Sequence, residues 1–477
     1  MKLRFMNIKI NKQSILFFFA LTLFTVGCVP PETGNVNTNS TTNTLTTNMN
    51  TASNSMANTV QNKEADLQMP VTLPVLDAMF ADESFAQTLK SKLGVTDEEI
   101  DKLKKLARDS IGNLSEDNDS GSTRAAVERS NNQIRQILGD EKSTRFLQFV
   151  RERWSNGTDE AGNNSPATPE SGSAASKVNS IPTDTRVVVN APAYRMDLFQ
   201  EGKLVKSYKI GIGYPEFPLP SGMRKASTII FNPTWTPPDE AWVKGKIQAG
   251  KIVEAGSKDN PLGPIKIPIG SPSLIHGGKS AARLGGFASH GCVGLTNGQV
   301  QDFALNLSKI SNTPLTELEI KGFEKQKTET KDFKLAKTIP VELRYETIVV
   351  EDGKLKIYRD VYERGTNTEE NLRKVFDSYG VSFDELPEAE RTKILQGLKQ
   401  MAVDATGQAI ETGNTNSNVN SSNSNSTNVM AKGKNSNSNT NDGGGAVTRN
   451  IKGKKEVMFI VAALKGKGYP APVNLAQ

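Results

Sequence analysis

The sequence predicts a mainly β central domain that follows an α-helical module, precedes an α+β extension and is separated from its neighbours by long disordered linkers. Three observations support this fold class. Apolar residues recur at helical spacing up to residue 154, and from residue 185 they form short strand-like runs between turns rich in Gly and Pro. After residue 331 both patterns occur. Segments rich in Asn, Ser and Thr, which have few apolar side chains to bury, lie between these regions.

The N-terminus is typical of an export signal. Basic residues precede an apolar run, 15–26, that is too short to span a bilayer, for which about 20 residues are needed. A small residue and Cys28 follow this run, as in a bacterial lipoprotein processing site. We therefore expect residues 1–28 to be a lipoprotein signal peptide and Cys28 to anchor the chain to a membrane that faces the periplasm or cell wall. The outer membrane is favoured, because Val29 is not the Asp that retains some lipoproteins at an inner membrane. The alternatives are an ordinary signal peptide and an uncleaved anchor.

The charge distribution argues against a nucleic-acid binder. The formal net charge is +6, but residues 1–28 carry four basic and no acidic residues, so their removal leaves about +2. A second basic cluster lies near the C-terminus. The middle of the chain therefore has no broad basic face, and nucleic acid is not an expected partner.

The region before the central domain carries no visible chemistry, since 67–154 contains neither His nor Cys. Thr96 and Glu99 form a predicted capping box at the start of a helix. We expect this module to act as a spacer or to dock a protein partner. The expected segments are a disordered tether at 29–66, the helical module at 67–154 with further helices at 123–138 and 142–154, and a linker at 155–184.

The central domain is expected at 185–322. Its short apolar runs are bounded by turns, and Gly202 occupies the predicted turn of a hairpin. The expected elements are strands at 185–190, 194–199, 204–210, 265–269 and 315–320 and a helix at 298–310.

The C-terminal extension is expected at 331–402. Glu351-Asp352-Gly353 is a good hairpin turn between strand-like segments, and two amphipathic helices follow it. Near the end, the apolar run Glu456–Leu464 either pairs with a sheet edge or docks on a partner. The expected elements are strands at 340–350 and 354–358, helices at 369–379 and 387–401, a disordered linker at 412–445 and a basic and apolar tail at 446–477.

The stretch 274–297 concentrates the reactive side chains of the chain. It contains both histidines, His276 and His290, and one of the two cysteines, Cys292, among several glycines. Thiolate chemistry requires a thiol beside a group, such as an imidazole, that can take its proton. If Cys28 is lipidated, Cys292 is the sole free thiol in an oxidising compartment. The alternative is a buried structural cysteine.

Either histidine could activate Cys292. His290 would point to the same face if the segment were extended, but in a tight turn its ring would face away and support the loop. His276 could approach from a neighbouring strand. The adjacent amides of Gly291 and Cys292 are candidates for an oxyanion hole, and the Ser289 hydroxyl could bind a histidine or a substrate carboxylate.

His276-Gly277, a Gly-containing spacer and the block Ser289-His290-Gly291-Cys292-Val293 resemble the signature of the L,D-transpeptidase catalytic domain family (YkuD type). Upstream segments that include Pro220-Ser221-Gly222 and Asn260-Pro261-Leu262-Gly263 extend the resemblance over about 185–322. The resemblance implies a β-sandwich with a cleft under a mobile loop. The roles it implies are Cys292 as the nucleophile, His276 as the general base, His290 as a support of the site, and Gly277, Ser289 and Gly291 as oxyanion- or substrate-binding residues.

The resemblance also implies a reaction in peptidoglycan and cell-wall biosynthesis. The thiolate would attack the L,D-peptide bond before the terminal D-Ala of a stem tetrapeptide, release D-Ala and form a thioester. An amine acceptor would then resolve the thioester, which gives a 3→3 cross-link or attaches a protein. The resemblance implies stem peptides as partners, no metal or organic cofactor, and acylation of Cys292 by penem β-lactams.

Two alternatives follow from the same residues. With water as the acceptor, the enzyme would be an L,D-carboxypeptidase. An inactive wall-binding lipoprotein is the other alternative, because Gly294 stands where many family members carry Arg and others Asn. Thr296, Asn297 or Arg283 are the candidates to replace that side chain.

Overall fold

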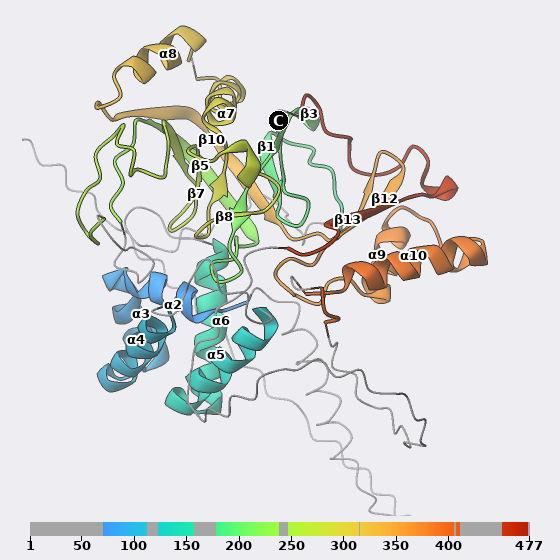
Figure 1. Ribbon diagram of the computed structural model, residues 1–477, viewed down its shortest axis with the longest axis horizontal. Helices are drawn as coiled ribbons and strands as arrows, with labels where there is room; N and C mark the ends of the chain where they lie inside the picture. Colours follow the sequence, from blue (N-terminus) through green and yellow to red (C-terminus); the bar gives the residue numbers. More distant parts are fainter. Residues whose placement is uncertain are drawn as a thin grey trace, which may run out of the picture. The chain divides into compact units, whose positions relative to one another are not determined.

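The computed structural model (Figure 1) describes residues 70–111, 123–156, 178–237, 247–313, 315–404, 407–410 and 451–475. Several sequence predictions lie outside these residues, namely the signal peptide with Cys28, the tether at 29–66, most of the linker at 155–184 and the linker at 412–445. In the described part of the chain, no helix is both long and apolar enough to cross a membrane. The structure confirms a mainly β central region with helices before it and α+β elements after it.

The N-terminal region consists of helices that share one buried core, which includes Phe85 and Trp154. The predicted capping box is confirmed, because the Thr96 amide donates to Glu99 Oε2 (2.8 Å) and the Glu99 amide donates to Thr96 Oγ1 (3.2 Å). The first helix is apolar on nearly all sides, so it lacks the amphipathic period that reveals a helix in a sequence. The helices are α2 (Leu73–Phe80), α3 (Glu83–Leu93), α4 (Asp97–Ile111), α5 (Thr123–Leu138) and α6 (Asp140–Asn156).

The central region is built on an eight-stranded sheet with the strand order β3-β2-β1-β10-β5-β6-β7-β9. The predicted hairpin between β2 and β3 is confirmed, and both turn residues, Glu201 and Gly202, have positive φ (49° and 77°), as a two-residue hairpin turn requires. A small parallel pair, β4 and β8, lies next to the main sheet, because Gly211, just before β4, exchanges two backbone hydrogen bonds (2.9 Å each) with Gly294 of β9. The strands are β1 (Arg186–Asn190), β2 (Arg195–Gln200), β3 (Lys203–Lys209), β4 (Ile212–Gly213), β5 (Gly222–Phe231), β6 (Ile265–Pro268), β7 (Leu274–His276), β8 (Phe287–Ser289), β9 (Val293–Gly294) and β10 (Lys331–Arg344).

Strand β10 corrects the expected organisation of the chain. Its residues were expected to begin a separate extension at 331–402, after a domain complete at 185–322. Instead, β10 lies inside the sheet, parallel to β1 and antiparallel to β5 (Figure 1). Val341 and Leu343 are buried in the same core as β1. Sequence patterns cannot reveal this pairing, because it joins strands that are far apart in the chain.

A second correction concerns 315–320, which was expected to be a strand. This segment enters α8 (Glu317–Lys325) through a capping box between Thr316 and Glu319. An alternating strand would place Leu318 and Ile320 on the same face, but Leu318 is 80% exposed while Ile320 is buried. The capping box therefore outweighs the short apolar run. The predicted helix before it is confirmed by α7 (Asn297–Ile310), whose N-cap is Thr296.

The C-terminal region forms a three-stranded sheet covered by two helices. The predicted hairpin is confirmed, with positive φ at Asp352 (48°) and Gly353 (74°). The apolar run near the C-terminus forms an edge strand that pairs antiparallel with its neighbour, with Leu355 opposite Phe459, so the sheet-edge alternative is the observed one. The elements are β11 (Ile348–Glu351), β12 (Lys354–Tyr358), α9 (Glu369–Ser378), α10 (Glu388–Met401) and β13 (Glu456–Ile460).

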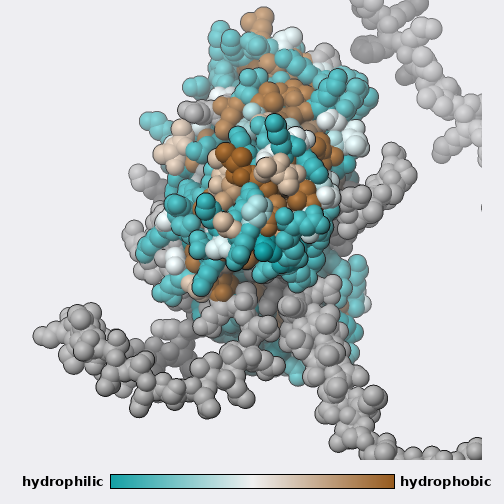
Figure 2. Space-filling view, turned by 90° about the vertical axis from the view of Figure 1, so that its right-hand side faces the viewer, coloured by the Kyte–Doolittle hydropathy of each residue, from teal (hydrophilic) through white to brown (hydrophobic). Residues whose placement is uncertain are grey.

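Strand β13 leaves apolar side chains at the surface. Met458 and Ile460 are 53% and 78% exposed. The face of the molecule on the side of α9, α10 and β13 shows hydrophobic residues gathered within a hydrophilic surround (Figure 2). In the part of the C-terminal sheet that the structure describes, β13 is an outermost strand, beside β12.

Candidate active site

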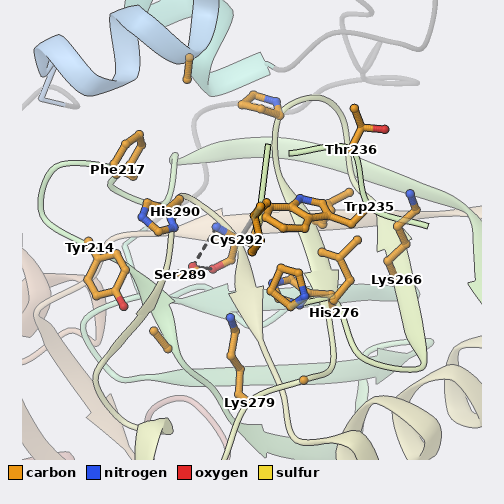
Figure 3. Close-up of a pocket in the computed structure, with 18 of the residues that line it drawn as sticks. Tyr214, Phe217, Trp235, Thr236, Lys266, His276, Lys279, Ser289, His290 and Cys292 are labelled. Atoms are coloured by element: carbon orange, nitrogen blue, oxygen red, sulfur yellow. Dashed lines mark hydrogen bonds between the residues drawn. The ribbon is translucent and has the colours of Figure 1, made fainter. Parts of the chain in front are cut away.

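One pocket of about 990 Å³ collects most of the predicted site residues. His276, Ser289, His290 and Cys292 line it, with Cys292 at its centre in Figure 3. Aromatic rings and two lysines also line this pocket. They include Tyr214, Phe217, Trp235, Lys266 and Lys279.

Strands β7 and β9 bring the thiol and the first histidine together. The two strands are parallel, with Ile275 opposite Val293 and His276 opposite Gly294. Cys292 directly precedes β9, and His276 ends β7, so the two residues lie at neighbouring points and line the same pocket. Figure 3 shows both side chains directed into the pocket. The alternative in which His276 arrives from a neighbouring strand is therefore the one observed.

His276 is buried beside two backbone carbonyls. The residue is 3% exposed, and its Nδ1 lies 2.8 Å from the Gly277 carbonyl oxygen. Because a carbonyl oxygen only accepts, this contact favours the tautomer that carries its proton on Nδ1. The pKa of His276 is lowered to about 3, mainly by burial and also by the positive charge of Lys279, while hydrogen bonds to the carbonyls of Gly277 and Leu262 act in the opposite direction. The imidazole is therefore neutral at physiological pH.

The loop around the nucleophile is fixed by Gly291 and Ser289. Gly291 has φ +88°, a conformation that glycine adopts without strain. Ser289 Oγ accepts from the Cys292 amide (3.0 Å) and donates to the Cys292 carbonyl (2.6 Å). The serine hydroxyl thus braces the loop backbone, and neither of the partners expected for it, a histidine or a substrate, is its partner in this structure. The Cys292 amide, a candidate oxyanion donor, is engaged by the same contact.

The contacts of Gly277 differ from the oxyanion- or substrate-binding role that the family resemblance implies for it. Its amide donates to the Ile265 carbonyl (3.1 Å) in the sheet, and its carbonyl holds His276. A Cβ atom at this position would lie 2.9 Å from Val300 Cγ1, so the residue faces α7. Gly277 therefore contacts the base and the helix, and its amide is not open to an oxyanion in this structure.

His290 packs away from the thiol. Its ring lies edge-on between Tyr214 and Phe217, with ring centroids 5.1 and 4.8 Å away (Figure 3). This is the tight-turn alternative, in which the ring supports the loop. The geometry therefore favours His276 as the base.

Lys279 is the functional candidate that sequence reasoning missed. It lines the pocket, and its amino group points toward the centre of the site in Figure 3. Burial raises the pKa of the Cys292 thiol, whereas a backbone hydrogen bond from Leu274 and the positive charge of Lys279 oppose that rise. No local pattern links residue 279 to residue 292, so the sequence carried no signal for it.

The three residues named as possible replacements for a side chain at position 294 are engaged elsewhere. The Thr296 hydroxyl accepts from the Gln299 amide (3.2 Å) at the start of α7. The Asn297 side chain accepts from the Gly278 amide (2.8 Å), and Arg283 donates to the Tyr214 hydroxyl (3.3 Å). Each of these side chains has a structural contact of its own, and Arg283 also lines the pocket.

The helical N-terminal region supplies part of the pocket wall. Asp82 and Trp154 line the pocket together with two alanines, Ala78 and Ala81. The Trp154 indole donates to the Pro218 carbonyl (3.1 Å), and a Cβ atom at Gly291 would lie 3.4 Å from that indole. A region expected to act only as a spacer or docking module thus contacts the loop that carries the nucleophile.

In the described residues, no group of three or more His, Cys, Asp or Glu side chains is placed to hold a metal ion. The chemistry visible in the pocket is that of a thiol, a neutral imidazole and an ammonium group. Such a site can perform acyl transfer through a covalent thioester.

Comparison with known proteins gives one family match. Residues 184–328 match the family model YkuD, described as the L,D-transpeptidase catalytic domain. No curated protein matches the chain. The family match ends just before β10 begins.

Solved structures give more distant similarities. An NMR structure of the catalytic domain from E. faecium L,D-transpeptidase is 17% identical, over 35% of this chain and 100% of that chain, with a TM-score of 0.22. Mycobacterium tuberculosis L,D-transpeptidase 1 is 15% identical, over 34% of this chain and 61% of that chain, with a TM-score of 0.20. The chain spans about half the length (50%) of a mutant Enterococcus faecium L,D-transpeptidase to which it is 16% identical, over 34% of its own length, with a TM-score of 0.20.

Proposed function

We propose, from the premise that residues 184–328 are an L,D-transpeptidase catalytic domain of the YkuD family, that the chain is a cysteine-dependent L,D-transpeptidase acting on peptidoglycan stem peptides. The observation that carries the proposal is the pairing of β7 with β9, which brings His276 and the adjacent Cys292 to one pocket. Family membership supports an acyltransferase, and the residue roles below are ours.

In the first half-reaction His276 Nε2 takes the thiol proton, and the sulfur of Cys292 attacks the carbonyl carbon of the L,D-peptide bond. The tetrahedral intermediate collapses with cleavage of the C–N bond, and the leaving amine of D-Ala takes the proton from His276. A thioester remains on Cys292. The neutral state of His276 supports this step, because only a neutral imidazole can accept the proton.

In the second half-reaction an acceptor amine attacks the thioester. Its proton passes to His276 and then to the departing sulfur, so that a new amide forms and the thiol is restored. The acceptor is the side-chain amine of a second stem peptide, which gives a 3→3 cross-link. A pocket of about 990 Å³ offers room for a peptide beside the thiol.

The test uses the full chain and purified disaccharide-tetrapeptides. Mass spectrometry should detect released D-Ala and 3→3 dimers, and both should be absent with Cys292→Ala of unchanged circular dichroism. Tripeptide without dimers would mean that water is the acceptor and that the enzyme is a carboxypeptidase. The absence of product, of a thioester and of a penem adduct would replace the proposal with a wall-binding protein.

We also propose, from the sequence, that the chain is exported and lipid-anchored through Cys28. A labelled fatty acid fed to cells that express the chain should be incorporated into it. Cys28→Ser should abolish incorporation and Cys292→Ser, which also removes one thiol, should leave it intact. Equal labelling of both variants would contradict anchoring at Cys28.

A further inference from the structure

The space beside β9 is filled by a lysine. Gly294 is the second residue of β9, and a Cβ atom built on it would lie 2.8 Å from Cγ and 3.1 Å from Cε of Lys279. Real Cβ atoms do not approach other atoms so closely, so the stem of Lys279 occupies the volume that any side chain at position 294 would need. Lysine side chains are usually exposed and flexible, but the Lys279 side chain has a defined position in the wall of the pocket.

The backbone holds Lys279 in this position. Its amide donates to the Leu295 carbonyl (3.1 Å), directly after β9. The preceding residue, Gly278, has φ +79° and donates its amide to the Asn297 side chain (2.8 Å). These two hydrogen bonds attach the turn after β7 to Leu295 and Asn297, which follow the nucleophile in the chain. They fix the backbone position from which the Lys279 side chain enters the pocket.

The electrostatic partner of the Lys279 ammonium group is the Cys292 thiolate. Within the described residues Lys279 has no ion pair with a carboxylate. Its pKa is lowered by burial and by the positive charge of Arg283, whereas the Cys292 thiolate raises it. Lys279 in turn disfavours protonation of His276. The remaining titratable or charged groups of the pocket are Asp82, Tyr214, Asp259, Lys266, Arg283 and His290.

We propose that Lys279 is a positioning residue whose ammonium group stabilises the Cys292 thiolate, and that Gly294 is small because this lysine needs its space. The proposal deepens the transpeptidase function proposed above by separating two tasks at the thiol. His276 takes the proton, and Lys279 stabilises the negative charge that remains on sulfur. Without such a cation, a buried thiol would stay protonated to higher pH and would react more slowly at neutral pH.

The test measures alkylation of Cys292 by iodoacetamide as a function of pH, by mass spectrometry of the peptide that contains Cys292. The thiolate forms a C–S bond, the C–I bond breaks and iodide leaves, so no stem peptide is required. Lys279→Met keeps much of the stem and removes the charge. We expect its profile to move to higher pH by about one unit, which means about tenfold slower alkylation at neutral pH.

Two further variants separate charge from structure. Lys279→Arg retains a cation and should restore most of the wild-type profile. Gly294→Ala leaves Lys279 chemically intact but forces it to move, so it should shift the profile in the same direction as Lys279→Met. In the Lys279→Met background, Gly294→Ala should add less than it does alone, because the charge it would displace is already gone.

The matched control is Lys266→Met, which removes another lysine of the same pocket. Lys266 lies on β6, and the groups that shift the pKa of the Cys292 thiol are Leu274 and Lys279 together with burial, so the alkylation profile of Lys266→Met should stay at its wild-type position. An unshifted profile for a folded Lys279→Met, or an equal shift for Lys266→Met, would overturn the proposal. If alkylation responds as expected while no transpeptidation is found, the inference about the thiol stands and the substrate assignment fails.

Discussion

Trp154 connects the helical N-terminal region to the catalytic loop, and its removal tests whether that contact matters. The side chain is 1% exposed, is among the largest fully buried side chains and donates a hydrogen bond to the Pro218 carbonyl (3.1 Å). Truncation of a buried tryptophan to alanine costs about 3–5 kcal/mol, and the loss of a donor from a buried carbonyl adds about 1 kcal/mol. We expect Trp154→Ala to lower the free energy of unfolding by about 4 kcal/mol.

The assay is urea-induced unfolding followed by far-UV circular dichroism, which does not depend on the deleted chromophore. Trp154→Phe is the matched control, since it keeps an aromatic ring and loses the indole N–H, and it should cost about 1–2 kcal/mol. Penem acylation of Cys292 should be slower in Trp154→Ala, because the indole packs against the Gly291 backbone. A loss of stability below about 1 kcal/mol, as for an ordinary surface substitution, together with normal acylation would refute the reasoning.

Three other predictions concern the site itself. The pKa of His276 is about 3 in the folded chain, whereas that of an unfolded histidine is about 6.5, so the unfolded state binds a proton first and the free energy of unfolding should fall as pH falls from about 6.5 to about 3. His276→Gln should flatten that part of a plot of stability against pH, and an unchanged slope would contradict the assignment. Gly291→Ala should lower the free energy of unfolding by about 1–2 kcal/mol in thermal or urea unfolding, because φ +88° strains any residue with a Cβ atom, while the nearest side-chain atom, at 3.4 Å, leaves room for the added methyl group. A neutral effect would show that the loop adopts another conformation. Ser289→Ala removes two hydrogen bonds to the Cys292 backbone, so it should lower the free energy of unfolding by about 1–3 kcal/mol and slow alkylation of the thiol. Ser289→Thr keeps the hydroxyl and should lose less stability, and equal losses in the two variants would indicate a steric cause.

Features with local causes were predictable from the sequence. Gly202 and Gly353 mark hairpins because both turns need positive φ, and Thr96 with Glu99 marks a helix start because the capping contacts span one turn. The stretch that carries His276 and Cys292 was identifiable because their side-chain chemistry is rare in this chain.

Features that depend on distant partners were not predictable. The position of Lys279 is set by an empty volume at Gly294, and the burial of Trp154 is set by a loop on another part of the chain. The choice between the two histidines needed the register of β7 against β9. Each of these features depends on three-dimensional packing between distant residues, which neither the periodicity nor the composition of the sequence reveals.

The place of β10 also affects the timing of assembly. A ribosome makes His276 and Cys292 before it makes β10, yet β10 separates β1 from β5 in the finished sheet. A nascent chain that has reached residue 328, where the family match ends, would leave both neighbouring strands with open edges. Farther along the chain, the Tyr362 hydroxyl donates to the Gly213 carbonyl (2.9 Å) and so secures β4 beside the site. The reactive thiol is therefore synthesised early and organised late, and a truncated chain that ends at residue 328 should carry the complete motif without a stable fold.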